Sequence, residues 1–372
     1  MKSHVKKILR NGIFKYYSLL DSLGFDVSSK TPVNFIVEKA DWAIKWVGKY
    51  ICENISVSHP NFIKITTNPA PIKNRIIHFG SQYQWLLWEP YISGNNNIVV
   101  SFFHGKRSDG ESVRKHIDNF LLTVPKISRI VTGSELIKNR LIDWGIELTK
   151  IIKIPIGCDT TYFIPPTTKQ KQEARLKLGV PDNAICIGSF QKDGIGWGDG
   201  AEPKLIKGPD IFVSVTRELK RHIPIFILLT GPARGYVKNE LEKNDIPYHH
   251  SYLTNYKEIL DFYHALDLYL VTSREEGGPM ALMESMASHV PVISTKVGQA
   301  EDLIEDKVTG GLVNVDDIES ICERALHYIN LDSNIKETQL VEARKKIVDG
   351  YDWKFVANQH YTKVYMPLIN NN

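Results

Sequence analysis

Short apolar runs alternate with amphipathic segments along the first half of the chain. Helical spacing of apolar residues marks segments around 39–54, 112–122 and 134–145. Ser134 opens the last of these and Glu135 stands in its first turn, so Ser134 is predicted to cap that helix. Runs of strand length occupy residues 33–38, 75–80, 97–103, 129–134 and 150–157. Strands and helices in alternation are typical of a parallel sheet whose strands are joined by crossover helices.

The alternation starts again after residues 163–169, where Pro165 and Pro166 interrupt any regular element. Beyond this break, runs of strand length occupy residues 184–190, 224–231, 267–273 and 290–296, and helices are predicted to begin at residues 209, 237, 279 and 352. We therefore predict an α/β protein with two doubly wound, Rossmann-like domains, in which ligands bind beyond the carboxyl ends of the strands. The predicted boundaries are 1–165 and 166–351 for the domains and 352–372 for a C-terminal helix.

The composition agrees with two globular domains. The 372 residues are 42% hydrophobic and 24% charged, which excludes a mainly disordered chain, and a single core seldom exceeds about 250–300 residues. No apolar run approaches the roughly 18 residues that a membrane-spanning helix needs. The basic N-terminus lacks the apolar segment of a secretory signal, so we expect a cytoplasmic protein. The four cysteines show no paired or metal-binding spacing and are expected to be reduced: Cys52, Cys158, Cys186 and Cys322.

Charge is divided unevenly between the two halves. Residues 1–165 contain 22 basic and 13 acidic side chains, a net +9, whereas the rest of the chain contains 24 basic and 29 acidic, a net −5. A basic half suggests an anionic partner, or it is simply a set of solvated lysines. The cluster Lys2, Lys6, Lys7 and Arg10 favours peripheral contact with the inner face of the cytoplasmic membrane, where each basic residue contributes about 1 kcal/mol. Nucleic acid is not expected as a partner, because the basic residues are scattered and form no recognised motif.

The segment 267–313 carries the most chemical information. A predicted strand ends at Ser273, and an acidic, glycine-rich turn follows it. Gly277 and Gly278 allow the backbone to approach a ligand closely, and Pro279 suits the first position of a helix. The free amides at such a helix N-terminus favour an anion or a hydroxyl, and here they belong to Met280 and Ala281.

Two glutamates frame this turn and helix. Glu276 lies in the turn, and Glu284 follows eight positions later on the helix. One carboxylate can border the phosphate end of a ligand while the other accepts hydrogen bonds from vicinal hydroxyls. Together they would form a receptor for a sugar nucleotide. The alternative is that both are ordinary solvated acids.

Several separated motifs match the sequence pattern of one protein family. The longest reads Glu276-Gly-Gly-Pro-Met-Ala-Leu-Met-Glu284-Ser-Met-Ala-Ser-His-Val-Pro-Val-Ile, in which seven residues separate the two glutamates. It continues with Val297-Gly-Gln-Ala-Glu-Asp-Leu-Ile and Thr309-Gly-Gly-Leu-Val, and Ile154-Pro-Ile-Gly-Cys-Asp159 stands at the end of the first domain. In these motifs the chain resembles glycosyltransferase family 4, retaining enzymes of the glycosyl transferases group 1. The resemblance covers roughly residues 97–366.

The resemblance implies the GT-B fold, in which two domains face a cleft and a C-terminal helix crosses back to the first domain. It implies that Glu284 binds the ribose hydroxyls of a nucleotide and that Glu276 contacts the transferred sugar. It also implies that backbone amides face sugar or phosphate, here those of Gly278, Met280 and Ala281. Pro279 departs from the family pattern, because it stands where Gly is frequent and it offers no N–H.

A positive clamp should stabilise the charge that develops on the leaving diphosphate, and the family supplies an Arg and a Lys. Lys207 matches the Lys, directly before Gly208. The Arg is absent, and Lys192, or less readily Lys204, is its candidate replacement. The insertion 193–203 is glycine-rich without the spacing of a P-loop or dinucleotide fingerprint. It is interpreted either as a flexible flap over the diphosphate or as a plain surface loop.

Further residues are weaker candidates. The resemblance places backbone contacts to the nucleobase at Tyr252 and Leu253. Tyr256 could stack on the base or pack in the core, and Arg234 could approach phosphate from a strand end. His104 follows a predicted strand of the first domain, where the family often has a His. It could contact the donor sugar or shuttle a proton, or it could be a structural histidine.

Together these features predict a metal-independent, retaining hexosyltransferase. It would move a sugar from a UDP- or GDP-sugar to a hydroxyl of a glycan, glycolipid or cell-surface polysaccharide precursor held by the first domain. No cofactor is expected besides the donor substrate. The lack of an Asp-x-Asp motif and the presence of Lys207 motivate metal independence. Two alternatives stay open: a GT-B sugar-nucleotide epimerase or hydrolase, and a catalytically silent sugar-nucleotide-binding subunit.

Overall fold

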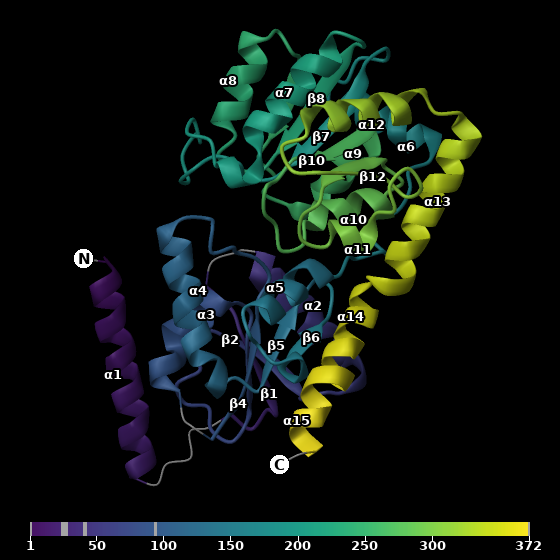
Figure 1. Cartoon of the computed structure of the whole chain (residues 1–372). Coiled ribbons are helices and arrows are strands. Elements are labelled where there is room, and N and C mark those ends of the chain that lie inside the picture. Colours follow the sequence, from purple (N-terminus) through teal and green to yellow (C-terminus); the bar gives the residue numbers. More distant parts are fainter. Residues whose placement is uncertain (1, 24–28, 40–42, 93–94, 371–372) are drawn as a thin grey trace. The chain divides into compact units, whose positions relative to one another are not determined.

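The computed structural model describes residues 2–23, 29–39, 43–92 and 95–370. Its contacts divide the chain into two compact units, each built on its own sheet (Figure 1). Unit 1 comprises Met1–Ile156 together with Trp353–Asn372, and unit 2 comprises Gly157–Asp352. The C-terminal segment therefore belongs to unit 1, although it follows unit 2 in the sequence.

Unit 1 contains a six-stranded parallel sheet in the order β2-β1-β3-β4-β5-β6. Its strands are β1 (Val33–Ile36), β2 (Ile63–Thr66), β3 (Ile76–Phe79), β4 (Asn97–Ser101), β5 (Arg129–Thr132) and β6 (Ile151–Lys153). Every residue of β1 and β3 is buried. Strands covered on both faces need apolar residues at successive positions, which explains why these two run as largely apolar segments in the sequence.

Helices and short turns connect the strands of unit 1. Ser134 Oγ accepts a hydrogen bond of 3.3 Å from the amide of Ile137, so the predicted cap of the helix after β5 is present. The helices are α1 (Lys2–Ser22), α2 (Ala43–Ser58), α3 (Gln82–Trp88), α4 (Glu111–Thr123), α5 (Glu135–Asp143), α14 (Trp353–Gln359) and α15 (Met366–Asn370). The shorter segments are η1 (Glu89–Tyr91), η2 (Val124–Lys126), η3 (Leu148–Lys150) and the π-helical η6 (His360–Tyr365).

The C-terminal helices are built into unit 1 by aromatic and polar contacts. Trp353 stacks on Tyr50 of α2 with 5.0 Å between ring centroids. The hydroxyl of Tyr365 lies 2.7 Å from Nδ1 of His78 in β3. Burial lowers the pKa of His360 to about 3, so this ring is neutral at physiological pH. A neutral, buried contact surface of this kind makes the segment part of the unit 1 core.

Unit 2 contains a second six-stranded parallel sheet, in the order β12-β11-β10-β7-β8-β9. Its strands are β7 (Ile185–Phe190), β8 (Ile225–Thr230), β9 (Tyr248–Ser251), β10 (Leu268–Val271), β11 (Val292–Thr295) and β12 (Gly311–Val313). Numbered within the unit, this is the doubly wound order 3-2-1-4-5-6. The direction of winding reverses between β7 and β10, and ligands of such sheets bind at the carboxyl ends of these two strands.

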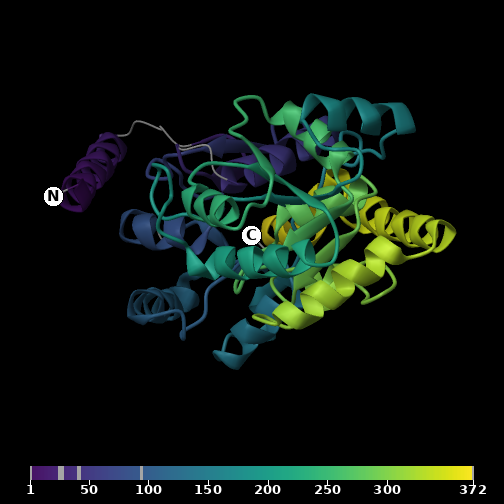
Figure 2. The same ribbon diagram turned by 90° about the horizontal axis from the view of Figure 1, so that it is seen from above.

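Helices of unit 2 lie on both sides of its sheet (Figures 1 and 2). Alternate strand residues face opposite ways: Ile227 and Leu229 join a core with α7, α8 and α12, whereas Tyr269 lies 6.0 Å from Tyr263 of α9, between ring centroids. The helices are α6 (Thr168–Lys177), α7 (Pro209–Lys220), α8 (Gly235–Lys243), α9 (Ile259–Ala265), α10 (Met280–Ala287), α11 (Ala300–Leu303), α12 (Ile318–Asn330) and α13 (Ser333–Gly350), with short turns η4 (Leu205–Lys207) and η5 (Tyr256–Glu258).

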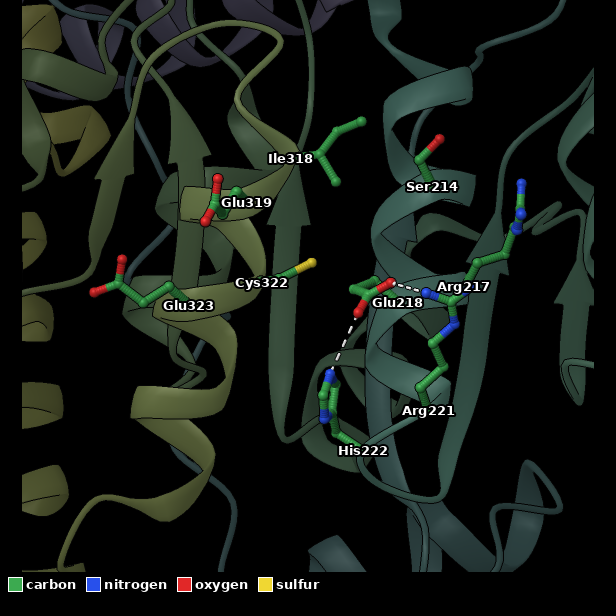
Figure 3. Close-up of a pocket in the computed structure, with 9 residues that line it drawn as sticks. All are labelled: Ser214, Arg217, Glu218, Arg221, His222, Ile318, Glu319, Cys322 and Glu323. Carbon is green, nitrogen blue, oxygen red and sulfur yellow. Dashed lines mark hydrogen bonds and ion pairs between the residues drawn. The ribbon is translucent and has the colours of Figure 1, made fainter.

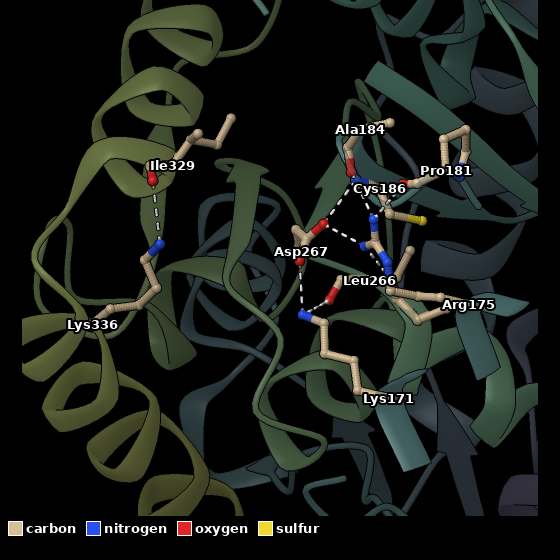
Figure 4. A network of polar contacts seen from close by, with 10 residues as sticks. Lys171, Arg175, Pro181, Ala184, Cys186, Leu266, Asp267, Ile329 and Lys336 are labelled. Atoms are coloured by element: carbon tan, nitrogen blue, oxygen red, sulfur yellow. Dashed lines mark hydrogen bonds and ion pairs between the residues drawn. The ribbon is translucent and has the colours of Figure 1, made fainter. Parts of the chain in front are cut away.

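The first helix of unit 2 is tied to the start of β10 by a charged network (Figure 4). Lys171 and Arg175 of α6 contact the two carboxylate oxygens of Asp267 at 2.7 and 2.8 Å. The second oxygen also accepts a bond of 2.9 Å from the amide of Cys186. Burial raises the pKa of Asp267, but Lys171, the amide of Cys186 and Arg175 outweigh it and hold the pKa below its usual value. This network fixes α6 against the sheet directly after the predicted linker.

The predicted fold class is confirmed, because both units contain a parallel six-stranded sheet with flanking helices. Several elements have no counterpart in the sequence analysis, among them the helices α1, α12 and α13 and the edge strands β2 and β12. The edge strands have only four and three residues, and β2 has two exposed positions, so neither forms a long apolar run. The predicted linker begins at Phe163, but this ring is buried and packs 5.6 Å from Tyr263, which makes it part of unit 2. All four cysteines are free and buried.

Candidate functional site

The candidate site of unit 2 lies where the sheet reverses its winding. Lys192 follows β7, Glu276 follows the neighbouring strand β10, and η4 places Lys207 beside them. The carboxyl ends of adjacent parallel strands meet at one sheet edge, so residues far apart in the sequence converge here. The structure thus brings together Lys207 and Glu276, which are both site candidates of the sequence analysis.

Lys207 and Glu276 form an ion pair at the centre of the site. Lys207 Nζ lies 2.6 Å from Oε1 of Glu276, and Ser273 Oγ donates to the same oxygen over 2.8 Å. The two side chains are 24% and 12% exposed, so the pair is partly buried but can be reached by a ligand. An ammonium in this setting can stabilise negative charge on a bound group, and the carboxylate can accept hydrogen bonds from hydroxyls.

Gly208 fixes the position of Lys207. Its backbone is left-handed, with φ of 63°, and a Cβ built there would lie 1.9 Å from the carbonyl oxygen of Thr272. Only glycine allows this approach. Thr272 Oγ1 donates to the carbonyl of Gly208 over 2.9 Å, and Gln191 Nε2 donates to the carbonyl of Lys207 over 3.1 Å. The ends of both central strands therefore hold the η4 turn.

A set of polar contacts that holds the η4 turn in place was not found by sequence reasoning. Arg274 contacts both carboxylate oxygens of Asp210 at 2.7 and 2.9 Å and lies 2.7 Å from Asp316. Its amide also donates to the carbonyl of Ile206 in η4 over 2.9 Å. The Asp210 carboxylate is partly buried, which raises its pKa, but the bond to Arg274 outweighs burial and lowers it. Asp210 stands two residues after Gly208, and this position at the start of a helix was the only available signal.

Glu284 has a different environment from Glu276. It lies on α10, is 3% exposed, and its Oε2 accepts a hydrogen bond of 2.6 Å from the hydroxyl of Tyr263. The hydroxyl of Tyr256 donates to Oε1. Burial raises the pKa of Glu284, and the two tyrosine bonds oppose this rise only in part. Sequence reasoning missed both tyrosine contacts, because nothing in the spacing of residues 256, 263 and 284 links them.

Two further lysines lie near the ion pair. Lys192 Nζ lies 3.9 Å from the centre of the Trp197 ring, a cation–π contact. Burial lowers the pKa of Lys204, and the positive charges of Lys207 and Lys192 lower it further. This electrostatic coupling places three ammonium groups in one neighbourhood, which suits a polyanionic ligand.

The insertion 193–203 is anchored at its base. The amide of Lys204 donates to the carbonyl of Asp193 over 2.7 Å, and the amide of Gly235 donates to the carbonyl of Asp199 over 2.6 Å. Arg234 Nε lies 3.0 Å from Asp193 in a fully buried ion pair, and its guanidinium also donates to backbone carbonyls. Arg234 is therefore a structural residue that holds this loop, and the suggestion that it approaches phosphate is wrong.

The remaining candidates of unit 2 lie at the same edge of the sheet. Gly278 precedes α10, and Met280 and Ala281 form its first turn. All three are half-buried. Tyr252 and Leu253 follow the edge strand β9, and the Tyr252 side chain is largely exposed. Their positions fit the predicted backbone contacts, which stay predictions.

His104 belongs to unit 1, where it follows β4 at the carboxyl end of that strand. The residue is exposed, and its ring lies 6.3 Å from the Tyr83 ring, which stacks on His116 at 4.0 Å. Burial lowers the pKa of His116, and the charge of His104 lowers it further. The roles of His104 in sugar contact and proton transfer stay predictions.

A separate pocket of about 610 Å³ lies between α7 and α12 (Figure 3). None of the predicted site residues lines it. Its Glu218 carboxylate pairs with Arg221 at 2.7 Å and with His222 at 3.3 Å. The Glu218 carboxylate is thus paired within the protein. The pocket is lined by residues of α7 and α12 and of the turn after α7, and not by residues that follow the strands, so it is not part of the candidate site.

Comparison with known families identifies the domain that holds this site. A family model described as Glycosyl transferases group 1 matches residues 202–347. The chain carries a glycosyl transferases group 1 domain. This group 1 domain contains Lys207, Glu276 and Glu284, so the resemblance stated from the motifs is confirmed at this level.

Curated proteins that are similar to the chain include named glycosyltransferases. The chain is 27% identical over 184 residues to the lipopolysaccharide core biosynthesis mannosyltransferase LpsB of Rhizobium meliloti, covering 47% of this chain and 49% of that protein. It is 26% identical over 230 residues to the D-inositol 3-phosphate glycosyltransferase of Corynebacterium aurimucosum, covering 56% and 49%. The chain thus spans about half the length of these curated relatives.

A solved structure shares the fold over most of both chains. Anabaena Alr3699/HepE, crystallised in complex with UDP, superposes with a TM-score of 0.71 at 15% identity, covering 90% of this chain and 99% of that one. At this identity the likeness concerns the fold alone. It agrees with the two parallel sheets described above.

Proposed function

We propose that the chain is a glycosyltransferase that moves a hexose from a UDP- or GDP-sugar to a hydroxyl of a glycan, glycolipid or polysaccharide precursor. The observation that carries this proposal is the Lys207–Glu276 ion pair, 2.6 Å apart at the winding reversal of a group 1 domain. The named relatives, which include a mannosyltransferase and a D-inositol 3-phosphate glycosyltransferase, support the reaction class.

Each residue of the site has a proposed role. The Lys207 ammonium stabilises the negative charge of the leaving diphosphate, with Lys192 in place of the family Arg. Glu276 orients the transferred sugar, and Glu284 binds the ribose hydroxyls. Amides of the turn before α10 and of its first residues face sugar or phosphate, with one donor fewer at Pro279. The base contacts the backbone at Tyr252 and Leu253.

We propose that transfer retains the anomeric configuration. The bond between the anomeric carbon and the diphosphate oxygen breaks, and a bond to the acceptor oxygen forms on the same face. The acceptor proton passes to the departing phosphate oxygen, so no protein nucleophile is needed. Neither a metal nor another cofactor has a role in this step, because the lysines provide the positive charge.

Donor turnover by the purified chain tests this proposal. A panel of UDP- and GDP-hexoses is first screened by thermal shift, since a bound donor stabilises the fold. Transfer or hydrolysis of the stabilising donor is then measured with and without EDTA. We expect activity in both conditions. Lys207→Ala removes a charge-stabilising group and Glu276→Ala removes the group that orients the sugar, so each should lower activity by about 100-fold or more.

Lys243→Ala is the matched control, because Lys243 forms an exposed ion pair with Glu240 in the same unit. This variant should keep full activity. Donor binding without turnover would instead favour a silent binding subunit, and donor consumption that no acceptor alters would favour an epimerase or hydrolase.

We also propose peripheral contact with an anionic membrane through α1. No helix in the described part of the chain is both long and apolar enough to cross a bilayer. On α1, however, Leu9, Tyr16 and Leu19 are more than half exposed, beside the basic Arg10 and Lys15. An amphipathic basic helix of this kind can lie in the interface of anionic lipids. The side chains of Lys2, Lys6 and Lys7, also part of this prediction, lie outside what the structure describes.

Co-sedimentation with vesicles tests this contact. We expect binding to vesicles that contain phosphatidylglycerol, weakened by high salt and by Leu9→Glu together with Leu19→Glu. Leu176→Glu is the control, because Leu176 is also an exposed leucine but lies on α6 of unit 2. Binding that neither salt nor the α1 variant alters would refute the proposal.

A further inference from the structure

The carboxylate of Glu284 already accepts hydrogen bonds from side chains of the protein. Glu284 is 3% exposed, yet both of its carboxylate oxygens have partners: Tyr256 donates to Oε1 and Tyr263 donates to Oε2. Two hydroxyl donors on the two oxygens of one carboxylate are what the vicinal hydroxyls of a ribose would supply. A nucleotide that uses Glu284 must therefore replace at least one of these tyrosine hydroxyls or share an oxygen with it.

The two tyrosines differ in how easily they can leave. Tyr263 lies on α9 and is fully buried, with ring contacts to Phe163 and Phe190 at 5.6 and 5.0 Å between centroids. Tyr256 is 40% exposed and opens the short turn η5, outside α9. Moving Tyr263 would open a cavity in the core. Tyr256 also has a ring contact to Phe163, at 6.4 Å between centroids, but it is partly exposed, so displacing it should cost less than displacing Tyr263.

We propose that Tyr256 is a displaceable occupant of Glu284, and that a ribose hydroxyl takes its place when the nucleotide binds. This inference rests on the proposed function, because it assumes that Glu284 receives the ribose. Tyr256 then lowers the affinity for every nucleotide that must displace it. It also keeps the buried carboxylate hydrogen-bonded while the site is empty or when the ligand lacks the matching hydroxyl.

The replacement makes a prediction about ribose recognition. A ribonucleotide exchanges one hydroxyl donor for another, so removing the Tyr256 hydroxyl removes a competitor and binding becomes tighter. A deoxynucleotide lacks the hydroxyl that would replace the Tyr256 hydroxyl on Glu284. Without the Tyr256 hydroxyl, it would leave one oxygen of Glu284 without a donor in a buried site, which is costly. Loss of this hydroxyl should therefore increase discrimination between the two ligands.

Titration calorimetry with Tyr256→Phe tests the inference, with UDP, GDP and their 2′-deoxy and 3′-deoxy analogues as probes. For whichever base binds, we expect Tyr256→Phe to tighten ribonucleotide binding by about tenfold, the size of one hydrogen bond to a charged group. For the analogue that lacks the critical hydroxyl, binding should be unchanged or weaker. The ratio of the two affinities should thus rise by at least the same factor.

Tyr263→Phe is the matched control, because it removes the other hydroxyl from the same carboxylate. We expect it to lower the unfolding temperature and to leave the ribose-to-deoxyribose ratio near that of the wild type. If Tyr256→Phe weakens all the probes equally or changes none, Tyr256 is only structural and the inference is wrong. If neither UDP nor GDP binds the wild type at millimolar concentration, the proposed function itself fails.

Discussion

The two glutamates of the motif lie in two different environments. Glu276 lies in the turn after β10, where it pairs with the Lys207 ammonium and accepts a bond from Ser273. Glu284 lies on the buried face of α10, and its donors Tyr256 and Tyr263 are both hydroxyl groups. One carboxylate is balanced by charge and the other by hydroxyl donors.

This difference suggests a division of labour along the bound donor. An ion pair near solvent can exchange partners with another charged group, as a diphosphate requires. A buried carboxylate between hydroxyls selects ligands that bring hydroxyls of their own, because an unmatched partner would leave it without donors. The Glu276 side of the site should therefore respond to phosphate, and the Glu284 side to ribose.

The largest effect is expected from a change that disrupts the Glu276 side. Gly208→Ala forces a Cβ to within 1.9 Å of the Thr272 carbonyl and strains a left-handed residue. We expect the free energy of unfolding to fall by roughly 3 kcal/mol or more, which corresponds to a decrease of about 6–12 °C in the Tm of a unit of this size. Thermal unfolding measures this loss.

Gly179→Ala controls for backbone strain alone. Gly179 also has a left-handed φ, of 69°, but nothing lies within 4 Å of the position that its Cβ would take. Gly179→Ala should lower the free energy of unfolding by about 1–2 kcal/mol. Equal losses in the two variants would contradict the role of the Thr272 contact in placing Lys207.

Ligand pairs can separate the phosphate side from the ribose side. Lys207→Gln removes a charge from the Glu276 side, so UDP should bind roughly 10- to 100-fold more weakly while uridine binding changes little. Glu284→Gln should weaken both ligands by a similar factor, because both carry the ribose. If GDP is the preferred ligand, guanosine replaces uridine. Equal effects of Lys207→Gln on nucleoside and diphosphate would refute the division.

The pH dependence of stability tests the burial of Glu284. Burial raises its pKa in the folded state, so the charged form carries a cost at neutral pH that disappears as the pH falls through the folded pKa. Relative to Glu284→Gln, the wild type should therefore gain stability on acidification from pH 8 to 5. Thermal unfolding across this pH range should show this gain as a rise in the Tm of the wild type relative to that of Glu284→Gln.

Asp267→Asn is the control for this pH scan. The cations and the amide around Asp267 hold its pKa below its usual value, so its contribution is complete above the unfolded pKa of about 4. The difference between wild type and Asp267→Asn should stay constant from pH 8 to 5. A Glu284→Gln difference that is equally flat would show that Glu284 is not desolvated.

The sequence predicted the strand ends of this site better than its hydrogen bonds. Apolar runs located β7 and β10, and the motif located Glu276, Glu284 and Lys207, because local patterns record these features. The Tyr256 contact joins residues 28 positions apart, and the Arg274–Asp210 pair joins residues 64 positions apart. Such contacts depend on how the crossover connections return to the sheet, and no local spacing records that.

The smallest expected effect concerns the cation–π contact of the phosphate side. Trp197 holds the Lys192 ammonium 3.9 Å from its ring centre, and an exposed contact of this type contributes about 0.5–1 kcal/mol. Trp197→Ala should weaken UDP binding by about two- to fivefold without affecting uridine, because Lys192 loses its orientation. In a Lys192→Gln background the same change should have no further effect, since the two residues act as a unit. Additive losses would show that Trp197 acts on the ligand independently of Lys192.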